Sequence, residues 1–315
     1  MIRPTLPTPT LWALYLSVLA VGCGDDGGGV DPDGGTGLDD AVAADGGEGE
    51  AITLANCDAS VEAAAAPFYQ QYFACSDISV TGAGTQLFST GLPPHPSAYY
   101  PADDPNYVAF DDRGGTHQKN PNELTSGNYT FTIPDAPVAK GITIDAALVD
   151  NSMNTSADEY GGGPVGMALN GVVIFAAMAA VGDELADEQF TFDSYEAHPA
   201  GTTYHYHFNT PGPLEVLVDR GYSSTATPGA GAVELYGVLC DGTVVMGCAE
   251  LDGSAPSGDD FDAQNGHVHD ISDGDTTHFA ERYHTHVCPG SWPDYPFFPE
   301  IAYYETTGCP AMGGP

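Results

Sequence analysis

One stretch of the chain occurs twice, and this duplication constrains the fold more than any other feature of the sequence. Residues 192–198 (FDSYEAH) align without a gap with residues 261–267 (FDAQNGH). Each copy follows an apolar segment with a tight turn, LNGV or CDGT, and precedes a tetrapeptide with two histidines, YHYH or YHTH. The same order of three elements in both copies predicts a duplicated domain, with half-repeats of about 165–210 and 233–290.

Glycine and proline interrupt the chain often, with 40 and 25 residues among 315. This composition favours turns and strands over long helices. Apolar and polar residues alternate at 129–133, 142–144 and 214–218, as in strands with one buried face. Apolar runs at 165–175 and 233–240 are typical of buried strands. We therefore expect a mainly β fold: an antiparallel sandwich or distorted barrel with two pseudo-repeated halves and a short N-terminal helix.

The segment before the β domain has helical composition. Across residues 58–75 (DASVEAAAAPFYQQYFAC) apolar residues recur at helical spacing, and Pro67 is expected to divide the element. The sequence therefore predicts an N-terminal helical segment over 51–84, followed by a β domain over 85–315.

The first 23 residues have the pattern of a secretory signal peptide. The apolar run 11–21 suits a signal sequence and is too short to span a bilayer comfortably. It leads into Ala-Val-Gly-Cys, typical of a bacterial lipobox, so we expect a lipid anchor at Cys23; an ordinary cleaved signal peptide is the alternative. Residues 24–50 are nearly all Gly, Asp, Ala and Glu, which predicts a disordered tether. Gly24 stands where Asp signals inner-membrane retention in many lipoproteins, so the expected location is the outer membrane or cell surface.

The chain is strongly acidic, with 44 Asp and Glu against 6 Lys and Arg and a net charge of −38. Nucleic acid is excluded as a partner because phosphate binding depends on clustered Lys and Arg. Docking on anionic lipid through charge is disfavoured for the same reason. Most carboxylates are expected to form a solvated surface. One acidic turn, residues 270–275 (DISDGD), raises calcium as an alternative ligand.

Six cysteines remain after the one in the lipobox, and an even number outside the cytoplasm predicts disulfides. Six cysteines allow fifteen pairings, and pairing of sequence neighbours is the simplest: Cys57–Cys75, Cys240–Cys248 and Cys288–Cys309. No CxxC motif occurs, which argues against a zinc site built from cysteine.

Histidines concentrate where the two repeats end. Residues i and i+2 of a strand face the same side, so His205 and His207 present two imidazoles to one ion, and His284 and His286 do the same. Imidazole is a common ligand of copper and zinc, which are the two metals that we expect. If the two halves pack face to face, the four side chains converge. The sequence leaves open whether the halves form one site or two. The further candidates near them are His198, His267 and His269.

The tyrosines and acidic residues around these histidines have other expected roles. Tyr204 and Tyr206 alternate with the histidines and therefore face the other way, into the core. Four acidic residues near the histidines are candidates for metal ligands, for groups that orient the imidazoles, or for a general base. They are Asp193, Glu196, Asp262 and Asp270.

Taken with its neighbours, the YHYH segment resembles the bacterial YHYH-domain proteins. Further matching motifs are GLPPH at 91–95, QKNPN at 118–122, YTFTIP at 129–134, GMALNG at 166–171 and NGH at 265–267. The resemblance covers about residues 85–309. It implies extracytoplasmic proteins, often lipoproteins, whose histidines are suspected of binding metal, and it adds His95 to the candidate ligands.

Three functions follow from these patterns. The first is a surface-anchored lipoprotein with a histidine-rich transition-metal site. The second is an extracytoplasmic enzyme at that metal, either a hydrolase with Glu196 or Asp262 as base or a copper oxidase. The third is a metal-free structural or adhesive module. No G-x-S-x-G, P-loop, H-E-x-x-H or dinucleotide-binding motif points to another reaction.

Overall fold

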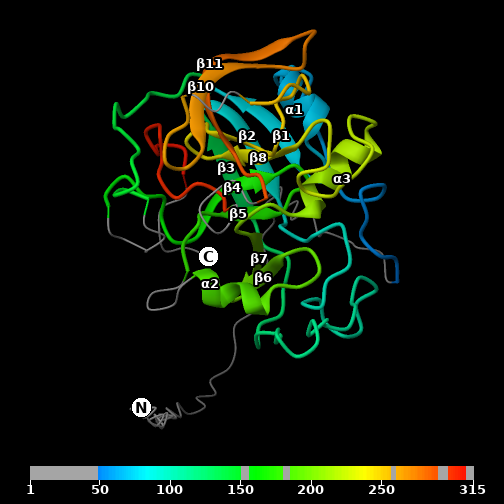
Figure 1. Ribbon diagram of the computed structural model, residues 1–315. Helices are drawn as coiled ribbons and strands as arrows, with labels where there is room; N and C mark the ends of the chain where they lie inside the picture. The colour runs from blue at the N-terminus through cyan, green and yellow to red at the C-terminus, as the bar shows by residue number, and fades with distance from the viewer. Residues whose placement is uncertain (1–48, 150–155, 180–184, 257–259, 290–296, 310–315) are drawn as a thin grey trace, which may run out of the picture. The chain divides into compact units, whose positions relative to one another are not determined.

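The computed structural model describes residues 49–149, 156–179, 185–256, 260–289 and 297–309 (Figure 1). These residues belong to one compact unit. The predicted leader, the predicted lipidation site Cys23 and nearly all of the predicted tether lie outside the described residues. Among the described residues, no helix combines the length and apolar character needed to cross a membrane.

The fold is mainly β, as the sequence predicts, and its strands form two sheets. The smaller sheet has three antiparallel strands in the order β1-β2-β3. Their bounds are β1 Asp77–Thr81, β2 Gly84–Ser89 and β3 Tyr129–Ile133. No closed barrel forms among the described strands, and the larger sheet is open at both edges.

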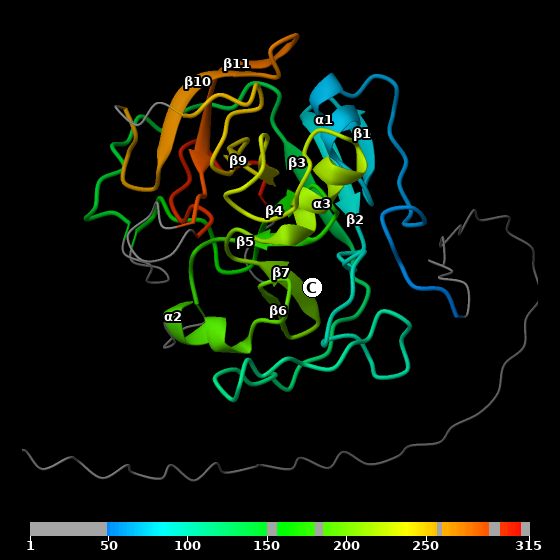
Figure 2. The ribbon, with the colours of Figure 1, turned by 45° about the vertical axis from the view of Figure 1, so that its right-hand side comes forward.

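The larger sheet has eight strands in the order β10-β11-β9-β8-β4-β5-β7-β6. Four strands belong to the first repeat: β4 Pro164–Ala168, β5 Val173–Phe175, β6 Ala197–Ala200 and β7 Thr203–Tyr206. Four belong to the second: β8 Leu235–Leu239, β9 Val244–Met246, β10 Gly266–Ser272 and β11 Thr277–His286. The hairpins β10–β11 and β6–β7 form opposite ends of this sheet (Figures 1 and 2).

The two halves of this sheet have the same connectivity, which confirms the duplication. In each half an antiparallel pair (β4–β5 or β8–β9) is followed by a parallel partner and then an outer antiparallel strand. The sheet is therefore mixed rather than purely antiparallel. The halves meet where β4 and β8 pair antiparallel and Met167 lies opposite Val238, its counterpart 71 residues on. A pseudo-twofold axis thus passes through the centre of the sheet.

Glycine makes this central contact close. A β-carbon on Gly237 would lie 2.2 Å from the backbone oxygen of Met167 and 2.8 Å from the α-carbon of Ala168. On its counterpart Gly166, a β-carbon would lie 2.5 Å from the backbone oxygen of Val238. Both strands therefore need a residue without a side chain at the position beside the axis.

The helices are short, and two differ from the sequence-based expectation. The predicted N-terminal helix is confined to α1, Pro67–Tyr72, because Pro67 occupies its first turn and so starts the helix instead of dividing it. The predicted strand 214–218 is wrong: it lies in helix α3, Pro211–Asp219, where Leu214 and Leu217 are buried and Val218 is exposed. Prolines at the start of the segment favour this helix. The remaining helical elements are α2, Leu185–Glu188, and the 3-10 turn η1, Gln189–Thr191.

Three disulfides link the described cysteines. Cys57–Cys75 confirms the local pairing. The other two local pairs are wrong: Cys240 joins Cys309, and Cys248 joins Cys288. The register explains the exchange, because β9 and β11 run parallel, so that the residues that follow them, including Cys248 and Cys288, leave the sheet at the same end. The predicted strand 142–144 has no strand partners among the described residues.

Candidate metal centres

Three buried histidines of the first repeat converge on one point. His198 on β6 lies opposite His205 on β7 in the strand register, and His207 follows directly after β7. The Nε2 atoms of His205 and His207 are 2.8 Å apart. Glu188, at the end of α2, places a carboxylate oxygen 3.7 Å from His198 Nε2 and 3.6 Å from His207 Nε2. We call these four residues the first centre.

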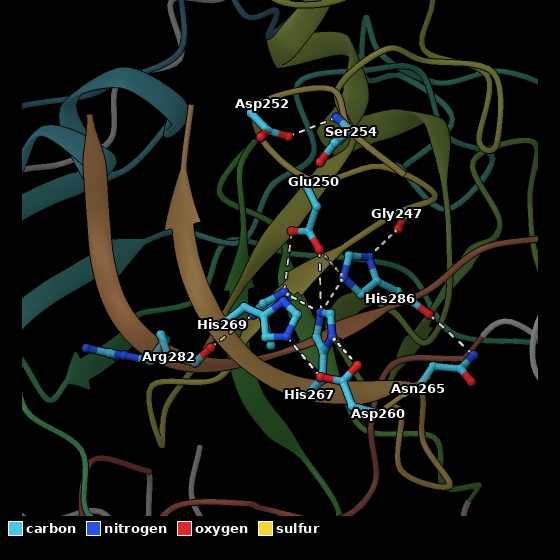
Figure 3. A network of polar contacts seen from close by, with 11 residues as sticks. Gly247, Glu250, Asp252, Ser254, Asp260, Asn265, His267, His269, Arg282 and His286 are labelled. Carbon is cyan, nitrogen blue, oxygen red and sulfur yellow. Dashed lines mark hydrogen bonds and ion pairs between the residues drawn. The ribbon is translucent and has the colours of Figure 1, made fainter. Parts of the chain in front are cut away.

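The second repeat builds the same arrangement at the other end of the sheet (Figure 3). His267 on β10 lies opposite His284 on β11, and His286 ends that strand. His267 Nε2 is 2.8 Å from His284 Nε2 and 3.2 Å from His286 Nε2. Glu250 lies 3.5, 3.4 and 3.2 Å from the Nε2 atoms of His267, His284 and His286 respectively. These four residues form the second centre.

The predicted pairing of histidines on strand faces is thus confirmed, and the structure settles their number. Four histidines do not converge on a single point; each half gathers three of its own. The ligand atoms within each group of three histidines, with Glu250 in the second, lie within 4.8 Å of one another. Four ligands around zinc at about 2.05 Å would stand about 3.3 Å apart, close to the Nε2 separations found here.

Backbone carbonyls determine the tautomer of four of these histidines. Each imidazole places Nδ1 2.9 Å from a carbonyl oxygen, which only accepts hydrogen bonds. The proton of the neutral ring therefore lies on Nδ1, and Nε2 carries a lone pair directed into the centre. The four pairs are His205 with Thr203, His207 with Ala176, His284 with Arg282 and His286 with Gly247.

The remaining two histidines follow the same rule through side chains. His198 Nδ1 is 2.6 Å from Thr191 Oγ1, whose own hydrogen is donated to the Glu188 carbonyl, so the imidazole is the donor. His267 Nδ1 lies 3.3 Å from Asp260 Oδ1, a carboxylate oxygen that accepts. All six imidazoles are thus held through Nδ1 with Nε2 directed inward, and hydrogen bonds of this kind orient the histidines that bind metals in proteins.

The first centre is electrostatically unfavourable without a cation. Burial lowers the pKa of His198 to about 3 and that of His207 to about 4, and it also holds the pKa of His205 well below its usual value. The neutral rings of His205 and His207 then direct two lone pairs at each other. A metal ion bound between them would turn this repulsion into coordination, and three neutral imidazoles suit a transition metal.

The second centre carries more negative charge. Burial opposes the ionisation of Glu250, but the imidazoles of His267, His284 and His286 around it outweigh burial and hold its pKa well below the usual value. Burial likewise lowers the pKa of His284. For His267 the carboxylates of Glu250 and Asp260 outweigh burial and raise the pKa. This balance favours a cation at the centre of the group.

Comparisons with known proteins add no name to these centres. No family model, curated protein or solved structure matches the chain. The resemblance to the YHYH-domain proteins therefore stays a prediction that rests on sequence motifs, and the chemistry of the centres rests on their geometry.

Two predicted ligands lie outside the histidine triads. His269, on β10 and 43% exposed, is 2.9 Å from Asp260 Oδ2. His95 is buried on the tyrosine face of the sheet: its ring stacks on Tyr195 at 3.5 Å, and its Nε2 lies 2.8 Å from the Tyr206 hydroxyl. His95 is thus placed in the core and not at a centre. Tyr204 and Tyr206 are buried on that same face, as the alternation predicts.

The four predicted carboxylates make their contacts elsewhere. Asp193 and Asp262 occupy equivalent positions and accept hydrogen bonds from Tyr204 and Tyr283, so they support the core behind each centre. Glu196 pairs with Arg113. Asp270 accepts a hydrogen bond from the Glu281 backbone. In the turn predicted to bind calcium, Asp273 accepts hydrogen bonds from two backbone amides and contacts His278. Both of its carboxylate oxygens therefore have partners within the hairpin.

Sequence reasoning missed the acidic residues that do reach the histidines: Glu188, Glu250 and Asp260. Glu188 precedes His198 by 10 positions, and Glu250 precedes His267 by 17, so the repeat alignment does not pair them. Among 44 acidic residues nothing marks these two. The alignment could have marked Asp260. Extended by one residue before the shared Phe-Asp, it pairs Asp260 with Thr191 and shows that the two repeats differ there.

The buried His95 predicts a measurable pH dependence of stability. Burial lowers its pKa to about 3, so below pH 6.5 the unfolded chain binds a proton that the folded chain rejects. Folding stability is therefore lost as the pH falls, by about 1.4 kcal/mol per unit from this group. Between pH 6.5 and 5, a His95→Gln variant should lose about 2 kcal/mol less than wild type in urea unfolding. Equal losses in both proteins would contradict the placement of His95.

Proposed function

We propose that this chain is an exported lipoprotein whose β domain binds two transition-metal ions, one in each half. The observation that carries the proposal is the shared tautomer of six buried histidines. Each Nδ1 is held by an acceptor, so each Nε2 offers its lone pair to a point shared with two others. Hydrogen bonding alone does not account for the neutral imidazoles of His205 and His207, which face each other through acceptor nitrogens 2.8 Å apart.

Three imidazoles form the donor set of the first centre, with the Glu188 carboxylate beside them, and three imidazoles with Glu250 form that of the second. Zinc favours four-coordinate sites built from His and Asp or Glu, and copper binds imidazole with high affinity. Calcium and magnesium require mainly oxygen ligands and fit this set poorly. We therefore propose zinc or copper as the resident ion.

Export and anchoring rest on the sequence. The apolar run that leads into the lipobox and the acidic tether support a lipid anchor at Cys23, on the outer membrane or cell surface. Three disulfides in the described residues support an oxidising location. The resemblance to YHYH-domain proteins supports the same location.

Metal content of paired variants tests the proposal. Residues 51–315, exported to the periplasm without a His tag, should contain about two equivalents of zinc or copper by mass spectrometry. His205→Ala/His207→Ala should contain one equivalent, His284→Ala/His286→Ala one, and the fourfold variant none, because each pair supplies two of three imidazoles. As a matched control, His95→Gln should keep both equivalents. A metal-free wild type after dialysis against both metals would overturn the proposal and favour a structural module.

A further inference from the structure

We propose that the two centres handle metal differently: the first retains its ion, and the second exchanges its ion with solution through an outer pair, Asp260 and His269. This inference rests on the proposed metal binding. It concerns two residues that the duplication itself sets apart.

The first centre is enclosed by aromatic rings. The side chains of His198 and His207 are only 8% and 2% exposed. Phe175 stacks on His205 at 3.8 Å, and the Phe192 ring packs edge-on against His198 at 4.8 Å. The imidazoles of the second centre are equally buried, at 1%, 0% and 3% for His267, His284 and His286, so the two centres differ in their aromatic cover and in the residues around them.

The second centre lacks part of this enclosure. The residue that corresponds to Phe175, 71 positions on, is Met246, and among the described residues no phenyl ring stacks on His284. Phe261 keeps the place of Phe192, 4.7 Å from His267. The aromatic cover is therefore reduced on one side of the centre.

An exposed ligand pair is added where the repeats differ. In the ungapped alignment, Asp260 replaces Thr191 and His269 replaces Ala200. Asp260 is 48% exposed, and its two oxygens contact His267 Nδ1 and His269 Nε2 at 3.3 and 2.9 Å. Asp260, His267 and His269 bring their ligand atoms within 4.8 Å of one another.

These residues place a surface cation one imidazole ring away from the second centre. Figure 3 shows Asp260 on the side of His267 opposite Glu250. An ion held by the Asp260 carboxylate and the His269 imidazole is adjacent to the centre while it still has water ligands. The net charge of −38 raises the local concentration of cations around such a pair. The first repeat has only a hydroxyl and a methyl group at these positions.

Zinc release from single-centre variants tests the inference. His205→Ala/His207→Ala retains the second centre, and His284→Ala/His286→Ala retains the first. Each is loaded with one equivalent of zinc and mixed with excess EDTA, and the zinc remaining on the protein is measured over time. We expect the second centre to release zinc at least tenfold faster than the first.

The decisive variants exchange the residues that differ between the two repeats, and zinc release is measured for each. Asp260→Thr/His269→Ala should slow release from the second centre toward the rate of the first while the stoichiometry stays at one. The exchange removes the exposed ligand pair, and the threonine hydroxyl can accept from His267 Nδ1 as Thr191 accepts from His198. The reciprocal Thr191→Asp/Ala200→His should accelerate release from the first. Equal release rates, or rates unchanged by the exchange, overturn this inference alone. Absence of zinc from both single-centre variants overturns the proposed function as well.

Discussion

Removing both metal ions with a chelator is expected to lower the melting temperature by about 20 °C. An ion at a thousandfold excess over its dissociation constant stabilises the fold by about 4 kcal/mol, so two ions contribute about 8 kcal/mol. Each kcal/mol corresponds to about 2–4 °C for a domain of this size. Loss of the ions also restores the repulsion between facing lone pairs in the first centre.

Differential scanning calorimetry with and without EDTA measures this shift in melting temperature. The histidine variants show how much of the shift each centre contributes. A protein with only one intact centre should show about half the shift on chelation. The variant without His205, His207, His284 and His286 should melt at the same temperature with or without EDTA. An unchanged melting temperature for the wild type on chelation would contradict metal binding at both centres.

A Gly237→Ala variant is expected to lose about 3 kcal/mol or more of unfolding free energy, because the new methyl group has no room. Its carbon would meet the Met167 backbone oxygen at 2.2 Å and the Ala168 α-carbon at 2.8 Å. Both atoms belong to the paired strand β4, so relief requires the two central strands to separate. This is the contact across the pseudo-twofold axis, and its loss should loosen both halves together.

Gly82→Ala is the matched control for that variant. Gly82 lies in the turn between β1 and β2, and a β-carbon there would meet nothing within 4 Å. Its unfolding free energy should stay within about 0.5 kcal/mol of wild type. Urea denaturation of both variants makes the comparison, and similar stabilities for the two would contradict the close approach of β4 and β8.

The duplication and the histidine pairs were accessible from the sequence, the first by aligning the two repeats and the second from the periodicity of a strand. Two histidines at i and i+2 must share a strand face, and tyrosines between them must face the core. The structure confirms both expectations at His205, His207 and Tyr206. The alignment of the repeats also identified His198 and His267 as equivalent residues. In the structure His198 lies opposite His205, and His267 lies opposite His284.

Features that depend on long-range packing were not accessible in this way. Glu188 and Glu250 reach the triads from non-equivalent positions, so no spacing rule finds them. The disulfides follow the parallel pairing of β9 and β11, which brings Cys248 and Cys288 together over 40 residues. At Leu214–Val218 the alternation of apolar residues fits a strand, but initiating prolines and burial of Leu214 and Leu217 produce a helix.

A crystal structure of the zinc-loaded protein, with anomalous data collected at the zinc edge, tests the central claim most directly. The account predicts two anomalous peaks at opposite ends of the eight-stranded sheet. One should be bound by Nε2 of His198, His205 and His207, and the other by Glu250 and Nε2 of His267, His284 and His286. A single peak shared by the two repeats, or no peak at either triad, would contradict it.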